Sequence, residues 1–410
     1  MLSATSTPQG AFTRRQHALV WGGSVLFGCF MTVYYWYILL VIKVPTDILE
    51  HVQYLAQQVC TEHQPMRANS GFHYAVWLLA GFSCDYALLV ETAILFLGAC
   101  WGATVYISAR VGLGLSSENQ EPLLHDTRRV ALVLFVAVAS CVLFPLPVAK
   151  SIYYLGLIPP NVYHNPTWLS GLPLNMAIFG LAVRQLNSKR TDLRAEALIS
   201  LLLVGSTLCK PSFAFIFAPA YVLLRVARHN WRQWPALALA LTVALLPATL
   251  LILGQAKWIA AYPQTTPGGA AHFVLAFPAG WHRVMPDLSW ERVLLRVFSS
   301  FALPGLAYYL QPDWLKRIPH QLALLCSGIG FLIFMLVCET GIRATHGNFM
   351  WQAIYGNHLL YWVVAASAVD WQPTSATERK RRKIILAAVL LSLASGILYL
   401  GIIVVRKSYA

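Results

Sequence analysis

The chain has 410 residues, of which 58% are hydrophobic and 11% are charged, and 30 Lys and Arg against 16 Asp and Glu give a net charge of +14. A soluble domain carries about a quarter charged residues, so this composition excludes an ordinary water-soluble enzyme. No RNA- or DNA-binding motif accompanies the positive charge, which is typical of the cytoplasmic loops of a membrane protein. We therefore expect no nucleic-acid partner.

Long apolar runs recur from one end of the chain to the other, and backbone groups in a bilayer must be paired within each span. We predict a single all-α polytopic membrane domain with about eleven transmembrane helices (10–12). The predicted spans are 18–42, 86–108, 130–149, 167–186, 194–209, 211–227, 235–254, 293–311, 320–338, 357–371 and 384–405.

Basic residues predict the orientation of these spans. Arg14 and Arg15 precede a first run that is too long for a cleaved signal peptide, so we expect a retained helix with a cytoplasmic N-terminus. Segment 71–83 is too short to cross about 30 Å of hydrocarbon, and we interpret it as an interfacial or re-entrant helix. Nineteen of the 30 basic residues then lie inside, which favours a periplasmic C-terminus.

Four outer segments are long enough to form a site: 43–85, 150–166, 255–292 and 339–356. The third contains the sequence TTPGGAAHF, whose prolines and glycines favour a lid. The eight cysteines form no CxxC pair and lie mostly in apolar runs, so we expect no disulfide framework and no redox chemistry.

The first outer segment begins with an amphipathic helix from Pro45 to about Val59. Asp47, Glu50 and His51 share one face with Tyr54 at helical spacing, and the apolar opposite face is suited to the bilayer surface. Two interpretations remain for Asp47. It forms a D-x-x-E capping box with Glu50, or it is a catalytic carboxylate, and the two roles are compatible.

Two further motifs place polar groups at the same membrane face. In YHNPTW (163–168), Asn165 or Thr167 suits a helix cap, Pro166 suits the first helical position, and His164 suits either a ligand contact or a structural role. Lys210 interrupts the apolar stretch STLCKPSFAF, which is either one kinked helix or a hairpin; basic clusters at both ends favour the hairpin. A cation at that depth marks a candidate functional site, with snorkelling to lipid headgroups as the alternative.

The last outer segment adds Arg343, His346 and His358, which suit an anionic lipid head or ordinary solvation. A divalent ion at Asp47, Glu50 and His51 is a weaker alternative, since metal-ligand spacing is missing. We therefore predict no metal and no cofactor.

These motifs resemble the C-type, polyprenol-phosphate-sugar-dependent integral membrane glycosyltransferases. The resemblance rests on TDILEHVQY (46–54) with its following interfacial helix, on YHNPTW, which is similar to the Tyr-His-Asn-Pro-Thr motif of a bacterial branch, and on CKPSF (209–213), which is similar to that branch's Lys-Pro-Ser turn. The chain lacks the acidic doublet that many members carry in the first loop.

The resemblance implies an inverting transferase in the bacterial inner membrane, with Asp47 as general base and with Lys210 and Arg343 on the donor phosphate. Apart from the resemblance, the sequence itself leads us to predict further substrate-binding residues: Glu50, His51, Tyr163, His164, Asn165, His346 and His358. The partners of such a transferase would be a lipid-linked sugar donor, a lipid-linked glycan or cell-envelope polysaccharide acceptor and membrane lipids, with a separate donor synthase and flippase in the pathway.

Three other functions stay open. A polysaccharide or lipid transporter predicts charged or broken helices at mid-membrane in two similar halves, whereas the polar residues here gather at one face. An O-antigen polymerase or ligase predicts a larger, arginine-rich late loop. A structural assembly subunit is the third alternative.

Overall fold

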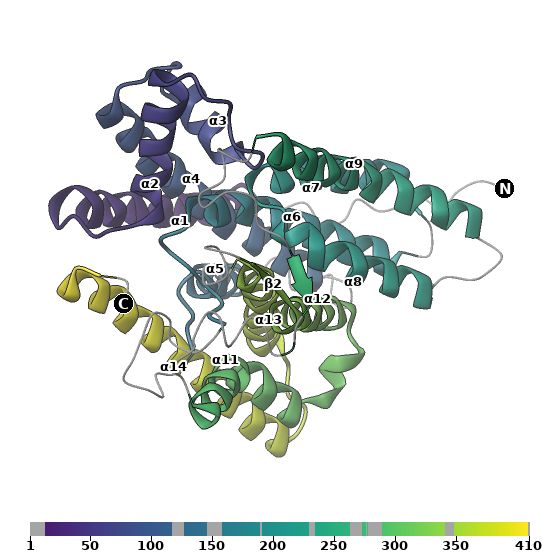
Figure 1. Ribbon diagram of the computed structural model, residues 1–410. Coiled ribbons are helices and arrows are strands. Elements are labelled where there is room, and N and C mark those ends of the chain that lie inside the picture. The colour runs from purple at the N-terminus through teal and green to yellow at the C-terminus, as the bar shows by residue number, and fades with distance from the viewer. Residues whose placement is uncertain are drawn as a thin grey trace.

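The structure is a computed structural model that describes residues 13–116, 127–145, 158–188, 191–228, 234–262, 273–275, 277, 289–340 and 348–408. Helices form nearly all of this part of the chain (Figure 1). The long helices are α1 (Arg14–Trp36), α4 (Tyr86–Ser116), α5 (Thr127–Ser140), α6 (Pro166–Asn187), α7 (Leu193–Cys209), α8 (Ser212–Arg228), α9 (Trp234–Ala261), α11 (Trp290–Leu310), α12 (Ile318–Leu336), α13 (Met350–Asp370) and α14 (Ala376–Arg406).

Short elements join the long helices. A pair of strands, β1 (Phe273–Leu275) and β2 (Val337–Glu339), is antiparallel and joins the predicted third outer segment to the start of the fourth. The short helices are η1 (Tyr37–Val41), which continues α1 as a π-helix, α2 (Asp47–Gln53), the π-helix η2 (Tyr54–Thr61), α3 (Gly71–Leu79) and the 3₁₀-helix η7 (Pro312–Lys316).

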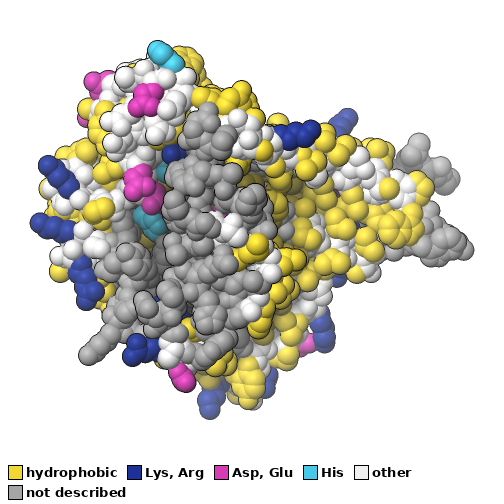
Figure 2. Space-filling model, viewed as in Figure 1, with side chains coloured by type: hydrophobic (Ala, Val, Ile, Leu, Met, Phe, Trp, Pro, Cys, Tyr) yellow, Lys and Arg dark blue, Asp and Glu magenta, His cyan; other side chains and the backbone are white. Residues whose placement is uncertain are grey.

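The architecture confirms an all-α polytopic membrane protein. Within the described residues, seven helices are long and apolar enough to cross a membrane: α1 with η1, α4, α6, α9, α11, α12 and α14. Figure 2 shows apolar side chains over much of the right-hand surface, and Leu239, Leu246 and Leu250 of α9 are each about half exposed. Exposed apolar surface of this extent suits contact with lipid.

Each predicted span overlaps one long helix, but some ends differ. Helix α5 ends at Ser140, nine residues before the predicted end of span 130–149. The chain folds back at Lys210, between the end of α7 and the start of α8, which confirms the hairpin and excludes one kinked helix. Helix α13 begins at Met350, seven residues before the predicted span, because a buried apolar face extends to that point. Helix α3 has nine residues, which rise about 13 Å and cannot cross the bilayer.

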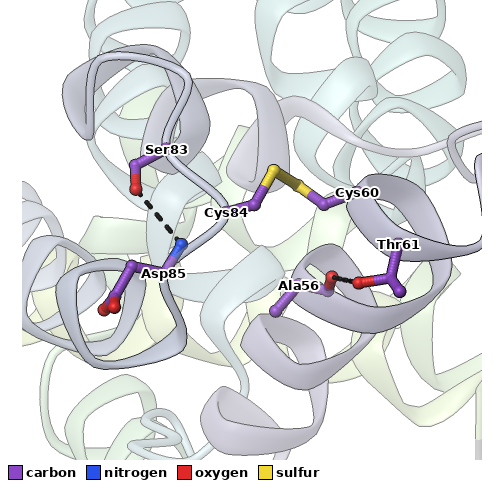
Figure 3. Close-up of a disulfide and its surroundings, with 6 residues drawn as sticks. All are labelled: Ala56, Cys60, Thr61, Ser83, Cys84 and Asp85. Atoms are coloured by element: carbon purple, nitrogen blue, oxygen red, sulfur yellow. Dashed lines mark hydrogen bonds between the residues drawn. A yellow bond between two sulfur atoms is a disulfide. The ribbon is translucent and has the colours of Figure 1, made fainter.

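The first outer segment contains a disulfide between Cys60 and Cys84, with Cα atoms 5.8 Å apart (Figure 3). The expectation of no disulfide was therefore wrong. Cys84 lies in the short connection between α3 and α4 rather than in an apolar span, and this connection returns to the end of η2. The bond joins the end of η2 to the start of α4, so it closes a loop of 24 residues that contains α3.

Helices α1 and α4, which flank this segment, pack with their backbones in contact. A Cβ atom built on Gly28 of α1 would lie 2.9 Å from the carbonyl oxygen of Gly98, and one built on Gly102 of α4 would lie 2.9 Å from that of Ser24. Small residues permit such close approach between membrane helices.

A buried ionic cluster joins α6, α7 and α8 at the ends of these helices away from Lys210. Tyr221 donates hydrogen bonds of 2.8 and 3.0 Å to the two carboxylate oxygens of Glu196, and Arg225 lies 3.2 Å from the same carboxylate. Arg225 also donates to the carbonyl oxygen of Gln185. The side chain of Glu196 is 0% exposed. We call Glu196, Tyr221, Arg225 and Gln185 the Glu196 cluster.

Candidate functional site

Asp47 is the first residue of α2 and does not cap it. Thr46 is the N-cap, because its hydroxyl oxygen accepts from the backbone N–H of Leu49. The predicted capping box of Asp47 with Glu50 is therefore wrong, and Glu50 is exposed on the outer side of the helix. Since Thr46 performs the capping, the carboxylate of Asp47 is available for other contacts, and its side chain stays 37% exposed.

The apolar face of α2 and η2 packs against protein. Ile48, Val52 and Leu55 are each at most 1% exposed, and α2 contacts α4 and α6. The prediction that this face lies on the bilayer surface was therefore wrong. Burying three aliphatic side chains stabilises the helix by several kcal/mol and fixes the position of Asp47.

The segment YHNPTW contributes residues both to the core and to the site. The hydroxyl of Tyr163 donates to the carbonyl oxygen of Cys141 at 2.9 Å, and Tyr163 is 1% exposed. The next two residues face Asp47 instead. The Nδ2 of Asn165 donates to Oδ2 of Asp47 at 2.9 Å, and Nε2 of His164 lies 3.9 Å from the same oxygen. Tyr163 thus anchors the segment, while His164 and Asn165 contact the carboxylate.

Asn165 also caps α6. Its Oδ1 accepts from the backbone N–H of Trp168 and from the hydroxyl of Thr167, each at 2.9 Å, and Pro166 occupies the first turn. Both were among the predicted alternatives. The side chain of Asn165 therefore joins the start of α6 to Asp47.

Lys210 lies beside this start of α6. Its Nζ donates to the hydroxyl oxygen of Thr167 at 3.4 Å and lies 4.4 Å from the centroid of the Trp351 ring. The His164 ring packs against Trp351 at 6.1 Å between centroids. One cation, one carboxylate and an aromatic face therefore meet between α2, α6, α13 and the α7–α8 turn.

Arg67 is a second cation, which the sequence analysis did not select. Its guanidinium lies 3.8 Å from the centroid of the Tyr54 ring. Trp258 and Gln255 of α9 bind the carbonyl oxygens of its two neighbours, Met66 and Ala68. One sequence signal was available: Arg67 is the single Lys or Arg between residues 44 and 85.

Two histidines lie between these cations. Nδ1 of His51 and Nε2 of His73 are 3.0 Å apart. Burial holds the pKa of His51 well below its usual value, and His73, Arg67 and Lys210 lower it further. Burial lowers the pKa of His73 to about 3, with a smaller contribution from Arg67.

The pKa of His164 responds to both charges of the site. Burial lowers it, the carboxylate of Asp47 raises it, and Lys210 lowers it. Opposed effects of this kind place His164 within electrostatic reach of the carboxylate of Asp47 and of the ammonium of Lys210.

The remaining predicted residues lie elsewhere. His358 is 1% exposed, and its Nδ1 lies 3.1 Å from the carbonyl oxygen of Pro160 and from Oδ1 of Asn161. It holds the segment that leads to His164 and does not contact Asp47. Arg343, His346 and most of the predicted lid lie outside the described residues. Within the residues that are described, no group of three His, Cys, Asp or Glu could hold a metal ion.

Comparisons with known proteins leave the family open. The chain matches no protein-family model and no curated protein.

The chemistry of the site follows from its residues. A half-exposed carboxylate with one oxygen fixed by Asn165 can accept a proton from a bound hydroxyl. Two cations on aromatic faces, Arg67 and Lys210, can attract an anionic group. The partly exposed rings of His51 and His164 can position polar hydroxyls through hydrogen bonds.

Proposed function

We propose that the chain is a glycosyltransferase of the bacterial inner membrane that moves a monosaccharide from a polyprenyl-phosphate donor to a lipid-linked glycan or cell-envelope polysaccharide. The observation that carries the proposal is the carboxylate of Asp47, fixed by Asn165 and linked through α6 to Lys210. The resemblance of the surrounding motifs to the C-type glycosyltransferases supports the same activity.

The proposed reaction needs no nucleotide. Asp47 accepts the proton of the acceptor hydroxyl as its oxygen attacks the anomeric carbon, and the bond from that carbon to the lipid phosphate breaks with inversion. The departing phosphate takes the electron pair of the broken bond. Lys210 and Arg67 stabilise its added negative charge, and Trp351 offers an apolar face to a sugar ring.

We propose eleven transmembrane helices with the N-terminus in the cytoplasm and the C-terminus in the periplasm. Helices α5, α7, α8 and α13 complete the set, because each overlaps a predicted span; α5 supplies 14 residues, which rise about 21 Å, and so covers only part of its span. The Cys60–Cys84 disulfide supports an external first segment, since disulfides persist in oxidising compartments such as the periplasm.

The test is transfer of radiolabelled sugar from a panel of polyprenyl-phosphate donors, in membranes that contain the wild type or the Asp47→Asn variant. Asparagine keeps the shape of the side chain and removes the base, so we expect transfer to fall at least about 100-fold. Glu62→Gln is the matched control, because Glu62 is an exposed carboxylate of the same outer segment that was not predicted to bind substrate, and it should retain activity.

Two outcomes would contradict the proposal. Transfer that survives Asp47→Asn at equal abundance would exclude Asp47 as the base. Absence of transfer by the wild type, over the full panel of donors and envelope acceptors, would exclude the transferase and favour a transporter.

A further inference from the structure

A chain of three hydrogen bonds joins Lys210 to Asp47. Nζ of Lys210 donates to the hydroxyl oxygen of Thr167 at 3.4 Å, that hydroxyl donates to Oδ1 of Asn165 at 2.9 Å, and Nδ2 of Asn165 donates to Oδ2 of Asp47 at 2.9 Å. Every donor points from the cation toward the carboxylate. Donors aligned in this way polarise one another.

The direction of the chain is fixed by the fold. Oδ1 of Asn165 also accepts from the backbone N–H of Trp168, and a backbone N–H can only donate. The amide oxygen must therefore face α6 and the amide nitrogen must face Asp47. The hydroxyl of Thr167 then has one acceptor, Oδ1, and accepts from an ammonium that can only donate.

The two middle residues of the hydrogen-bond chain, Thr167 and Asn165, are buried. Thr167 is 1% exposed and Asn165 is 5% exposed, so water does not readily replace either hydrogen bond. Asp47 itself stays 37% exposed. The chain therefore starts at a cation that can meet an anion and ends at a carboxylate that can meet a hydroxyl.

We propose that Thr167 is a positioning residue that transmits the state of Lys210 to Asp47 through Asn165. The proposal rests on the transferase function above. When an anionic donor draws the ammonium of Lys210 toward itself, donation to Thr167 weakens, and the donation that reaches Asp47 weakens with it. Asp47 then accepts a proton more readily with the donor bound than without it.

Other charged groups act on Asp47 through space and must be separated from this effect. His164 lies 3.9 Å away, Glu50 and His51 share its helix, and Lys210 and Arg67 lie close enough to act on His51. A Thr167→Val substitution keeps all of them and the volume of the side chain. It removes only the hydroxyl, while Trp168 still fixes the amide of Asn165.

The experiment compares pH profiles of sugar transfer for the wild type, Thr167→Ser and Thr167→Val, with a polyprenyl-phosphate sugar as donor. The kcat/KM profile reports the free enzyme and the kcat profile reports the complex. In the wild type the acidic limb of kcat should lie at higher pH than that of kcat/KM. Thr167→Val should move the kcat/KM limb up by about half a pH unit, the worth of one hydrogen bond, and leave the kcat limb in place.

Thr167→Ser keeps the hydroxyl and should keep the wild-type separation. Thr167→Ala gives a second variant without the hydroxyl if valine reduces the amount of folded protein. The proposal would be overturned if the serine, valine and alanine variants all showed the same separation between the acidic limbs of kcat and kcat/KM. Transfer by the wild type in that experiment would still support the proposed function. Absence of transfer by the wild type would instead overturn the function on which the proposal rests.

Discussion

Two polar centres occupy opposite ends of the same three helices. The site around Asp47 uses the start of α6 and the α7–α8 turn, and the Glu196 cluster uses the end of α6, the start of α7 and the end of α8. The 20 residues from Asn165 to Gln185 rise about 30 Å, the thickness of the hydrocarbon core. Both centres contain a carboxylate beside cationic and polar side chains.

The two centres differ in how far their carboxylates are exposed to solvent. Glu196 is 0% exposed and its carboxylate is held by Tyr221 and Arg225, whereas the side chain of Asp47 is 37% exposed. A buried carboxylate whose partners are all protein groups joins helices together. A half-exposed carboxylate that is fixed on one side can still react with a ligand. We therefore propose a structural role for the Glu196 cluster, which we call the inner centre. We propose a chemical role for the site around Asp47, which we call the outer centre.

The largest expected effect is a loss of stability on substitution of Arg225, which belongs to the Glu196 cluster. Arg225→Gln leaves Glu196 buried without its cation, and breaking one partner of a buried pair costs about 3–5 kcal/mol. Thermal unfolding in detergent should show this loss, with transfer per folded molecule unchanged. The double variant with Glu196→Gln should recover most of the stability. A stable Arg225→Gln protein with no transfer would contradict the assignment.

The disulfide should stabilise the outer centre alone. It closes a loop of 24 residues, for which loop entropy predicts about 3 kcal/mol. Cys60→Ser with Cys84→Ser should lower the unfolding temperature and expose the first outer segment to limited proteolysis. Cys29→Ser, at an exposed free cysteine, is the control. Equal protease resistance with and without the bond would contradict this expectation.

The buried histidine pair should make the outer centre sensitive to acid. The folded protein holds the pKa of His73 at about 3, whereas the unfolded chain titrates near pH 6.5. Below pH 6.5 the unfolded chain therefore binds more protons. Stability is full above that pH and falls as the pH drops, by about 2 kcal/mol at pH 5 for this one group.

Thermal unfolding between pH 7 and 5 measures this loss, and His73→Gln, which does not titrate, is the matched variant. The wild type should lose more stability over this range than the variant. Parallel pH dependences of the two proteins would show that His73 becomes protonated within the fold.

The smallest effect concerns the aromatic face beneath Lys210. A cation over a Trp ring is worth about 0.5–2 kcal/mol, so Trp351→Leu should raise the KM for the donor about 2- to 30-fold, with a smaller change in kcat. Trp362→Leu, within α13 but packed against Phe179, controls for general effects of the helix. A fall in kcat alone would place Trp351 with the reacting atoms instead.

The sequence predicted the long helices because apolar runs of sufficient length have few alternatives in a bilayer. It also selected Asp47, His164, Asn165 and Lys210, since polar residues at helix ends are conspicuous in such a composition. It did not predict which atoms meet. The cap at Thr46, the contact of Arg67 with Tyr54 and the pairing of Cys60 with Cys84 all depend on how the chain folds back between α1 and α4, and no periodicity encodes that path.

Residues with similar sequence signals also had different outcomes. Tyr163 and His164 are adjacent, yet one is anchored in the core and the other contacts Asp47, because the chain bends at these two residues. His358 has the same residue type as His164 and is buried under residues 160 and 161. Burial, which a sequence pattern gives only approximately, decides between these roles.

If the proposed function holds, the glycine contact between α1 and α4 restricts how a lipid-linked donor reaches Asp47. Their backbones touch at Gly28 and Gly102, so an isoprenoid chain cannot pass between these two helices. Helices α1 and α4 are also the helices that precede and follow the first outer segment, which contains Asp47. Lateral entry of such a donor from the bilayer must therefore occur elsewhere around the bundle.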